Sequence, residues 1–189
     1  MLVTRENIHC VIEELRGDRT LSIDTETTGI RPYHGDEPFS IIISNGQESF
    51  YFNFNDYPDL PADERLDWET HHAALDQLLG EERTWCLHNA KFDMAMLATK
   101  NISLAGVIHD TMVTARVLDS TLRQGDFSLD ACVKRLGVEK DDTVKKYLLA
   151  HKLYTVEKSQ GKKTTKKNLR YALAPFDLIT SYGEKDAAI

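Results

Sequence analysis

The stretch LSIDTETTG, residues 21–29, decides how this chain folds. Apolar and polar residues alternate along 21–27, which predicts a strand with one buried face, and the residues TTG end it. Asp24 and Glu26 lie two positions apart, so their side chains project from the same face of this strand. Two carboxylates on one face repel each other unless a cation lies between them. The pattern is typical either of an exposed acidic strand end or of half a metal site.

On both sides of this stretch, helix-like and strand-like patterns alternate. The remaining predicted elements are a helix at 5–16, a strand hairpin at 39–45 and 49–54, a helix at 70–80, a strand at 84–89, a helix at 90–100, a strand at 106–110, and helices at 111–119, 128–136, 141–150 and from 176 onward. Together these elements predict an α/β fold with a mixed five-stranded sheet flanked by helices. Right-handed crossovers would then bring the ends of the strands at 21–27 and 84–89 close together.

The composition is that of an ordinary folded protein. With 189 residues, of which 41% are hydrophobic, the chain fits one compact domain. Neither an apolar run of about 18 residues nor a signal-peptide pattern is present in the sequence, so no membrane partner is predicted. The three cysteines, Cys10, Cys86 and Cys132, stand far apart in apolar contexts, which predicts buried thiols in a reducing compartment.

The charge is distributed unevenly along the chain. A net charge of −7 at first argues against a nucleic-acid partner, because phosphate binding needs Lys and Arg. Residues 151–170, however, carry a net charge of +6, and the rest of the chain carries −13. The cationic cluster consists of Lys162, Lys163, Lys166, Lys167 and Arg170. It suits either the backbone of a single nucleic-acid strand or a solvated, mobile loop at 159–168.

Two more acids stand in helical segments four residues after another polar residue. Asp93 follows Asn89 in HNAKFDMAML (88–97), and Asp186 follows Tyr182 in SYGEKDAAI (181–189). A spacing of four predicts that each pair shares one face of its helix, although surface amphipathicity gives the same pattern. Asp110 opens the helix at 111–119, where we favour a structural N-cap over a supporting part in an acidic cluster.

The blocks DTETTG, HNAKFDMAML and YGEKDA, in this order, resemble the three sequence blocks of the DEDD exonuclease superfamily. Tyr182, four residues before the last Asp, is similar to the tyrosine of the DEDDy branch. The likeness is greatest to the 3′–5′ proofreading exonuclease domain of family A DNA polymerases, especially bacteriophage ones, and it covers essentially the whole chain. The resemblance implies a ribonuclease H-like fold.

The resemblance also implies the roles of individual residues. Asp24, Glu26 and Asp186 would bind one divalent cation, Mg²⁺ or Mn²⁺, and Asp24 would share a second cation with Asp93, which holds it through water. Tyr182 would orient the attacking water. Thr27, Ile30 and Asn89 would contact the substrate, and the cationic cluster, which is expected from its charge alone, would join them. These residue types suit the chemistry, because hard cations take carboxylate oxygens and two of them activate water and neutralise phosphate charge.

The implied activity is removal of 5′-nucleoside monophosphates from a single-stranded or frayed DNA 3′ end, as proofreading in DNA replication. An RNA-trimming exonuclease of the ribonuclease D kind and a non-catalytic nucleic-acid-binding module are the alternatives. Because AAI ends the chain inside an apolar helical segment, we expect 1–189 to be the N-terminal domain of a longer polymerase, or else a nuclease that serves a separate polymerase. The expected location is the cytoplasm of a bacterial or phage-infected cell, with an organelle as the alternative.

Overall fold

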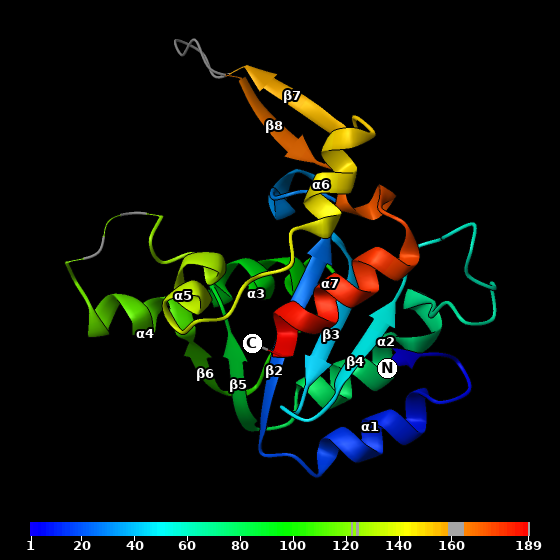
Figure 1. The fold of residues 1–189 in the computed structure, drawn as a ribbon. Coiled ribbons are helices and arrows are strands. Elements are labelled where there is room, and N and C mark those ends of the chain that lie inside the picture. Colours follow the sequence, from blue (N-terminus) through cyan, green and yellow to red (C-terminus); the bar gives the residue numbers. More distant parts are fainter. Residues whose placement is uncertain (122, 124, 159–164, 189) are drawn as a thin grey trace.

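The computed structural model describes residues 1–121, 123, 125–158 and 165–188, and its centre is one mixed sheet (Figure 1). The strands are β1 (Leu2–Val3), β2 (Thr20–Thr27), β3 (Pro38–Ser44), β4 (Ser49–Asn53), β5 (Arg83–Leu87) and β6 (Gly106–Asp110), in the spatial order β1-β4-β3-β2-β5-β6. The pairs β2–β3 and β3–β4 are antiparallel, and β1–β4, β2–β5 and β5–β6 are parallel. The α/β class is confirmed, but the predicted five strands are six, because the two-residue β1 is too short to show alternation.

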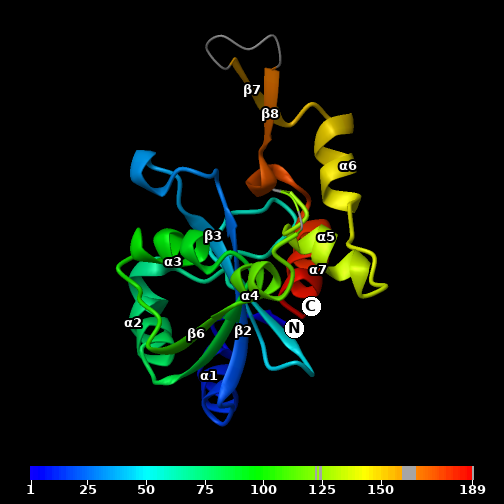
Figure 2. The same cartoon turned by 90° about the vertical axis from the view of Figure 1, so that its left-hand side faces the viewer.

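Helices cover both faces of this sheet. Figure 2, which views the sheet from the side, shows α1 (Ile8–Arg16), α2 (Trp68–Leu79) and α3 (Ala90–Ala98) on one face and α7 (Phe176–Ala188) on the other. The remaining helical elements are η1 (Pro32–His34), α4 (Thr111–Leu118), α5 (Leu129–Arg135), α6 (Thr143–Ala150) and η2 (Tyr171–Leu173). In the described part of the chain, no helix combines the length and the apolar character that crossing a membrane requires.

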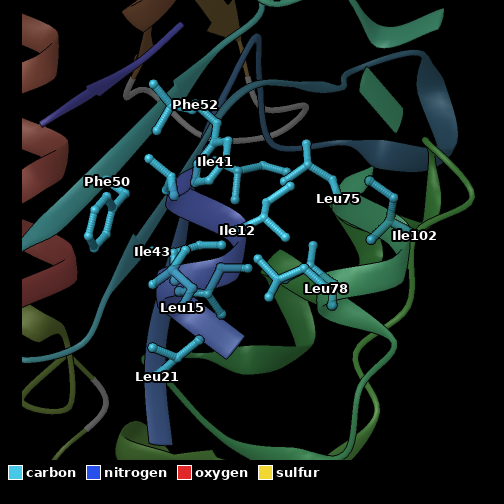
Figure 3. Close-up of a cluster of buried hydrophobic side chains, with 14 of the residues drawn as sticks. Ile12, Leu15, Leu21, Ile41, Ile43, Phe50, Phe52, Leu75, Leu78 and Ile102 are labelled. Atoms are coloured by element: carbon cyan, nitrogen blue, oxygen red, sulfur yellow. The ribbon is translucent and has the colours of Figure 1, made fainter. Parts of the chain in front are cut away.

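The central strands are buried on both faces, which fixes where the helices pack. Ile41 and Ile43 of β3 belong to the main core with α1 and α2, whereas Ile42, between them, packs with Ala187 of α7. The period of two in a strand sends alternate side chains to opposite faces, so one apolar run serves two cores. The main core, drawn in Figure 3, includes Ile12, Leu15, Leu21, Ile41, Ile43, Phe50, Phe52, Leu75, Leu78 and Ile102.

A two-stranded hairpin extends away from the sheet (Figures 1 and 2). It is formed by β7 (Tyr154–Lys158) and β8 (Thr165–Leu169), which pair antiparallel. The prediction of a loop at 159–168 is therefore wrong for its last four residues. The sequence hides β8 because its consecutive lysines, Lys166 and Lys167, are both exposed and leave no apolar alternation. Residues 159–164, with Lys162 and Lys163, lie outside the described residues.

All three cysteines are free thiols, as predicted. Their predicted burial is wrong for Cys10, which is exposed, and Cys86 and Cys132 are only partly buried. Cys10 lies on α1, where Ile8, Val11, Ile12 and Leu15 form the buried face. At a helical period of 3.6 residues, position 10 falls outside that stripe, so the apolar neighbours in sequence do not cover it.

Candidate active site

The acidic pair of β2 faces helix α7. Leu21 and Ile23 belong to the main core, so the alternation of β2 directs Asp24 and Glu26 to the opposite face. Helix α7 crosses that face, and the hydroxyl of Ser22 donates a hydrogen bond to the backbone carbonyl of Ala187. Strand and helix are thereby fixed against each other where the carboxylates of the first and third sequence blocks meet.

A glycine permits this close approach of α7 to the sheet. A Cβ atom at Gly183 would lie 3.1 Å from Cδ1 of Ile42 and 3.2 Å from the ring of Tyr51, closer than ordinary van der Waals contact. Gly183 stands between Tyr182 and Asp186 in the sequence, so a larger residue here would move both away from β2. Gly183 is unfavourable within a helix, but its lack of a side chain lets α7 hold Tyr182 and Asp186 close to β2.

The second sequence block contributes Asp93, which is 3% exposed, from the first turn of α3. Its Oδ1 accepts hydrogen bonds from the hydroxyl of Thr25, at 2.6 Å, and from the backbone N–H of Thr25, at 3.2 Å. Thr25 lies between Asp24 and Glu26, so these two bonds join Asp93 directly to the acidic strand. The three sequence blocks thus meet at the carboxyl end of β2.

Asp110 is the structural cap that the sequence favours. Its Oδ1 accepts the N–H groups of Met112 (2.9 Å) and Val113 (3.3 Å) at the start of α4. The same carboxylate also accepts N–H groups at the start of α3, from Asn89 (3.1 Å, to Oδ1) and Ala90 (3.0 Å, to Oδ2). One side chain therefore satisfies four backbone donors at two helix N-termini.

Burial and mutual repulsion set the protonation of the carboxylates. Burial, followed by repulsion from Asp93 and Asp186, raises the pKa of Asp24 well above its ordinary value. Burial and the charge of Asp24 do the same to the pKa of Glu26. Burial raises the pKa of Asp93 to about 6, against the opposing effect of the Thr25 hydrogen bonds. Burial also raises the pKa of Asp186. Negative charge is therefore concentrated here beyond what the protein alone neutralises.

The donor set fits a hard divalent cation. All four groups offer carboxylate oxygens, the ligands that Mg²⁺ and Mn²⁺ prefer. Oδ1 of Asp186 is buried and has no hydrogen-bond partner among the described residues, which leaves it free to coordinate. As the side chains stand, no three His, Cys, Asp or Glu groups in the described ranges are arranged to hold an ion. The ammonium of Lys140 lies 2.6 Å from Oδ2 of Asp186.

A cleft of about 690 Å³ opens over three of the carboxylates. Besides Asp24, Glu26 and Asp186, the lining includes Tyr182 and five of the residues expected to contact substrate, Thr27, Ile30, Lys166, Lys167 and Arg170. The ion pair between Arg31 and Glu157, at 2.8 Å, joins the loop after β2 to the hairpin above it. A second, more apolar cavity of about 640 Å³ also reaches Asp24 and Asp186 and extends to α4 and α5.

Asn89 does not share the face of Asp93. It precedes α3 in a left-handed conformation, with φ 69°, and is exposed, so helical spacing from Asp93 does not apply to it. Among the described residues, neither Asn89 nor Asp93 lines the cleft. The contact of Asn89 with substrate stays a prediction.

Two residues of the site were not predicted from the sequence. No spacing in the sequence points to Thr25, because the alternation of β2 sends its side chain to the face opposite Asp24 and Glu26. Lys140 stands in GVEKDD between two helices and has no spacing relation to Asp186, so only the folded chain reveals their contact.

Comparison with known proteins supports the assignment of the three blocks. A family described as 3′–5′ exonuclease matches residues 1–189. DNA polymerase I of Pseudomonas aeruginosa is 30% identical over 130 residues, which are 67% of this chain and 14% of that protein. The chain therefore spans a small part of the length of this relative.

Solved structures share the fold. RNase D of Escherichia coli, an exoribonuclease involved in structured RNA processing, superposes with a TM-score of 0.65 at 18% identity, over 100% of this chain and 41% of that one. Brucella melitensis NrnC with bound Mg²⁺ superposes with a TM-score of 0.57 at 16% identity, over 93% of this chain and 69% of that one. The carboxylate cluster and the family match over the whole length lead to one conclusion: the chain belongs to the 3′–5′ exonuclease domain family of family A DNA polymerases, nucleases of the DEDD type.

Proposed function

We propose that this chain removes nucleotides one at a time from the 3′ end of DNA, as the proofreading activity of a DNA polymerase. The observation that carries the proposal is the meeting of carboxylates from β2, α3 and α7, three of which, Asp24, Glu26 and Asp186, line a cleft that also has cationic side chains in its walls. The polymerase active site would lie in the same chain beyond the exonuclease domain or in a separate partner.

Asp24, Glu26, Asp93 and Asp186 would hold two divalent cations, Mg²⁺ or Mn²⁺. When bound, the cations supply a nucleophile at neutral pH and neutralise charge on the phosphate oxygens. Two observations support this role, because both describe a site that gains from added positive charge: Oδ1 of Asp186 is buried and has no hydrogen-bond partner in the part of the chain that the structure describes, and the pKa of the Asp24 carboxyl is raised.

The other cleft residues bind and orient the reactants. Burial raises the pKa of Tyr182, so its phenol stays protonated at neutral pH and can hydrogen-bond the attacking water. Lys166, Lys167 and Arg170 would bind backbone phosphates of the incoming strand. Each turnover would consume one water and release one 5′-nucleoside monophosphate, which leaves a new 3′-hydroxyl on the shortened strand.

DNA is the proposed substrate because the curated relative is a DNA polymerase, with 30% identity over 130 residues. RNA is the second candidate. The fold it shares with RNase D, at a TM-score of 0.65, favours this candidate as far as a fold alone can.

The deciding experiment compares 5′-labelled single-stranded DNA and RNA of one sequence, incubated with the protein in Mg²⁺ and in EDTA. The wild type should shorten DNA from the 3′ end only in Mg²⁺. Asp24→Ala should lose this activity, because it removes a ligand expected to serve both cations. Asp59→Ala, which removes an exposed carboxylate in the loop after β4, should cleave like the wild type.

Each alternative has its own outcome in this assay. Faster trimming of RNA than of DNA would assign the chain to the RNA-trimming class. Binding of either strand without cleavage at saturating Mg²⁺ would indicate a non-catalytic module. Activity in Asp24→Ala above a few per cent of wild type would refute the carboxylate mechanism.

A further inference from the structure

A lysine forms an ion pair with one member of the carboxylate cluster. Lys140 belongs to the segment between α5 and α6, and its side chain is 19% exposed. Its Nζ lies 2.6 Å from Oδ2 of Asp186, whose side chain is 5% exposed, and 5.2 Å from the centre of the Tyr182 ring. This ammonium also offsets part of the repulsion at Asp24 and Glu26. The positive charge of Lys140 therefore acts on Asp24 and Glu26 as well as on Asp186.

A second ion pair fixes the backbone next to Lys140. In this pair the acid belongs to the α5–α6 segment and the base belongs to α7. Asp141 Oδ2 lies 2.6 Å from Nζ of Lys185, the residue before Asp186 on α7. Two successive residues of the α5–α6 segment thus pair with two successive residues of α7. Lys140 is held at the site by this arrangement, whereas Lys185 is 56% exposed.

An ammonium and a divalent cation at one carboxylate compete for its negative charge and repel each other. Oδ2 of Asp186 is already paired with Lys140, whereas Oδ1 has no hydrogen-bond partner among the described residues. A cation that coordinates Asp186 would therefore weaken this pair, and it would be repelled by the ammonium 2.6 Å from Oδ2. Conversely, removal of the lysine leaves a partly buried carboxylate cluster without a counter-charge.

We propose that Lys140 is the resident counter-cation of the carboxylate site and that divalent cations displace it from Asp186 when they bind. The inference rests on the proposed metal site and adds a competitor to it. Lys140 stabilises the metal-free fold and, for the same reason, weakens metal binding.

The test uses Lys140→Met, which keeps the aliphatic length and removes the charge, and Lys140→Arg, which keeps the charge. Lys146→Met is the matched control, because it removes an equal charge from the neighbouring, exposed ion pair with Asp142. Each protein is melted in EDTA and in excess Mn²⁺, and the dissociation constant of Mn²⁺ is measured by calorimetry.

Lys140→Met should melt lower than wild type in EDTA, show a larger rise in melting temperature on addition of Mn²⁺, and bind Mn²⁺ about tenfold more tightly. Lys140→Arg should resemble the wild type. Lys146→Met should change the affinity by no more than about twofold, as expected of an exposed pair. If Lys140→Met does not fold in EDTA, recovery of a cooperative melt in Mn²⁺ gives the same support.

An equal loss of stability with and without Mn²⁺, at an unchanged dissociation constant, would mean that Lys140 only packs and would overturn the inference. Weaker Mn²⁺ binding by Lys140→Met would overturn it as well. A wild-type protein that binds no divalent cation would instead overturn the proposed metal-dependent function itself, so the two failures are distinguishable.

Discussion

The hydroxyl of Thr25 lies 2.6 Å from Oδ1 of Asp93 and links strand β2 to helix α3 inside the acidic site. The backbone N–H of Thr25 donates to the same oxygen, at 3.2 Å. Thr25 separates Asp24 from Glu26 along the strand, so any shift of β2 also shifts Asp93. The geometry of the whole carboxylate set therefore depends on a residue that is not itself an acid.

Thr25→Val should weaken metal binding while the overall fold persists. The substitution keeps the branched shape but removes the hydroxyl donor, so that among the described residues Oδ1 of Asp93 keeps the backbone N–H of Thr25. Loss of an outer partner of a metal ligand typically costs 10- to 100-fold in affinity, and we expect about tenfold here because one bond remains. Calorimetric titration with Mn²⁺ measures it. Thr25→Ser, which keeps the hydroxyl, should stay near the wild type, and equal affinities in Thr25→Val and Thr25→Ser would contradict the positioning role.

Asp110→Ala should lower stability equally with and without metal. The change removes the acceptor of four backbone N–H groups at the starts of α3 and α4. Removal of one cap costs roughly 1 kcal/mol, so two caps should cost about 2 kcal/mol, or about 4–8 °C in melting temperature for a domain of this size.

Asp67→Ala provides the matched control for this cap, because Asp67 caps only α2, through the N–H of Thr70. It should cost about half as much. If Asp110→Ala chiefly reduced the rise in melting temperature caused by Mn²⁺, Asp110 would belong to the acidic cluster rather than to the helix caps.

The metal-free protein should gain stability as the pH falls from neutrality toward 5. Burial raises the pKa of Asp93 to about 6, so the folded chain binds a proton that the unfolded chain, with a carboxyl pKa near 4, has released. Stability from this group is full below about pH 4 and is lost as the pH rises through about 6. The raised pKa values of Asp24, Glu26 and Asp186 act in the same direction.

Thermal melts in metal-free buffer at pH 5.5 and 7.5 check this linkage. Asp93→Asn cannot titrate and should respond less to pH than the wild type. A wild-type melting temperature that rises with pH over this window would show that the carboxylates are not crowded in the folded protein.

Strands of five or more residues with a buried face were predictable from the sequence. The strand expected at 21–27 is Thr20–Thr27, and the strand expected at 106–110 has the same bounds in the structure. Burial of one or both faces leaves a clear pattern in such segments. β1 and β8 left none, because β1 contains two residues and β8 forms part of a two-stranded hairpin whose lysines are exposed.

The site was predictable as far as local motifs reach. The blocks around Asp24, Asp93 and Asp186 stand out in the sequence, and the fold brings them together. The pairing of Lys140 with Asp186 joins segments 46 positions apart and depends on how the α5–α6 segment packs on α7, which no local spacing encodes. Asn89 shows the opposite error, since its spacing from Asp93 assumed a helical conformation that it does not adopt.

Replacing Lys166 and Lys167 with Ala should weaken binding of single-stranded DNA and flatten its dependence on salt. Both side chains line the cleft, and removing one lysine–phosphate ion pair should reduce the log–log salt slope by roughly 0.7. Fluorescence anisotropy at several salt concentrations measures the slope. The double variant Lys145→Ala, Lys146→Ala changes two exposed lysines of α6 that do not line the cleft and should keep the wild-type slope. Identical slopes in both double variants would place the strand elsewhere.

Tyr182→Phe should slow hydrolysis without loss of metal. Tyr182 lines the cleft beside Glu26 and Asp186. Burial, followed by the negative charges of these two residues, raises the pKa of Tyr182 and keeps its phenol protonated. Removal of the hydroxyl takes away the hydrogen bond that would orient the attacking water but no metal ligand. The rate should therefore fall by roughly tens- to hundreds-fold, the usual size of a positioning contribution.

Single-turnover cleavage of labelled DNA and calorimetric titration with Mn²⁺ separate the two effects of Tyr182→Phe. Tyr171→Phe is the matched control, because its ring lies 5.9 Å from that of Tyr182 and it also lines the cleft, yet it stands outside the third sequence block. It should change the rate far less. If the metal affinity of Tyr182→Phe fell in parallel with its rate, the phenol would act by holding Asp186 in place, and the water would be oriented by another group.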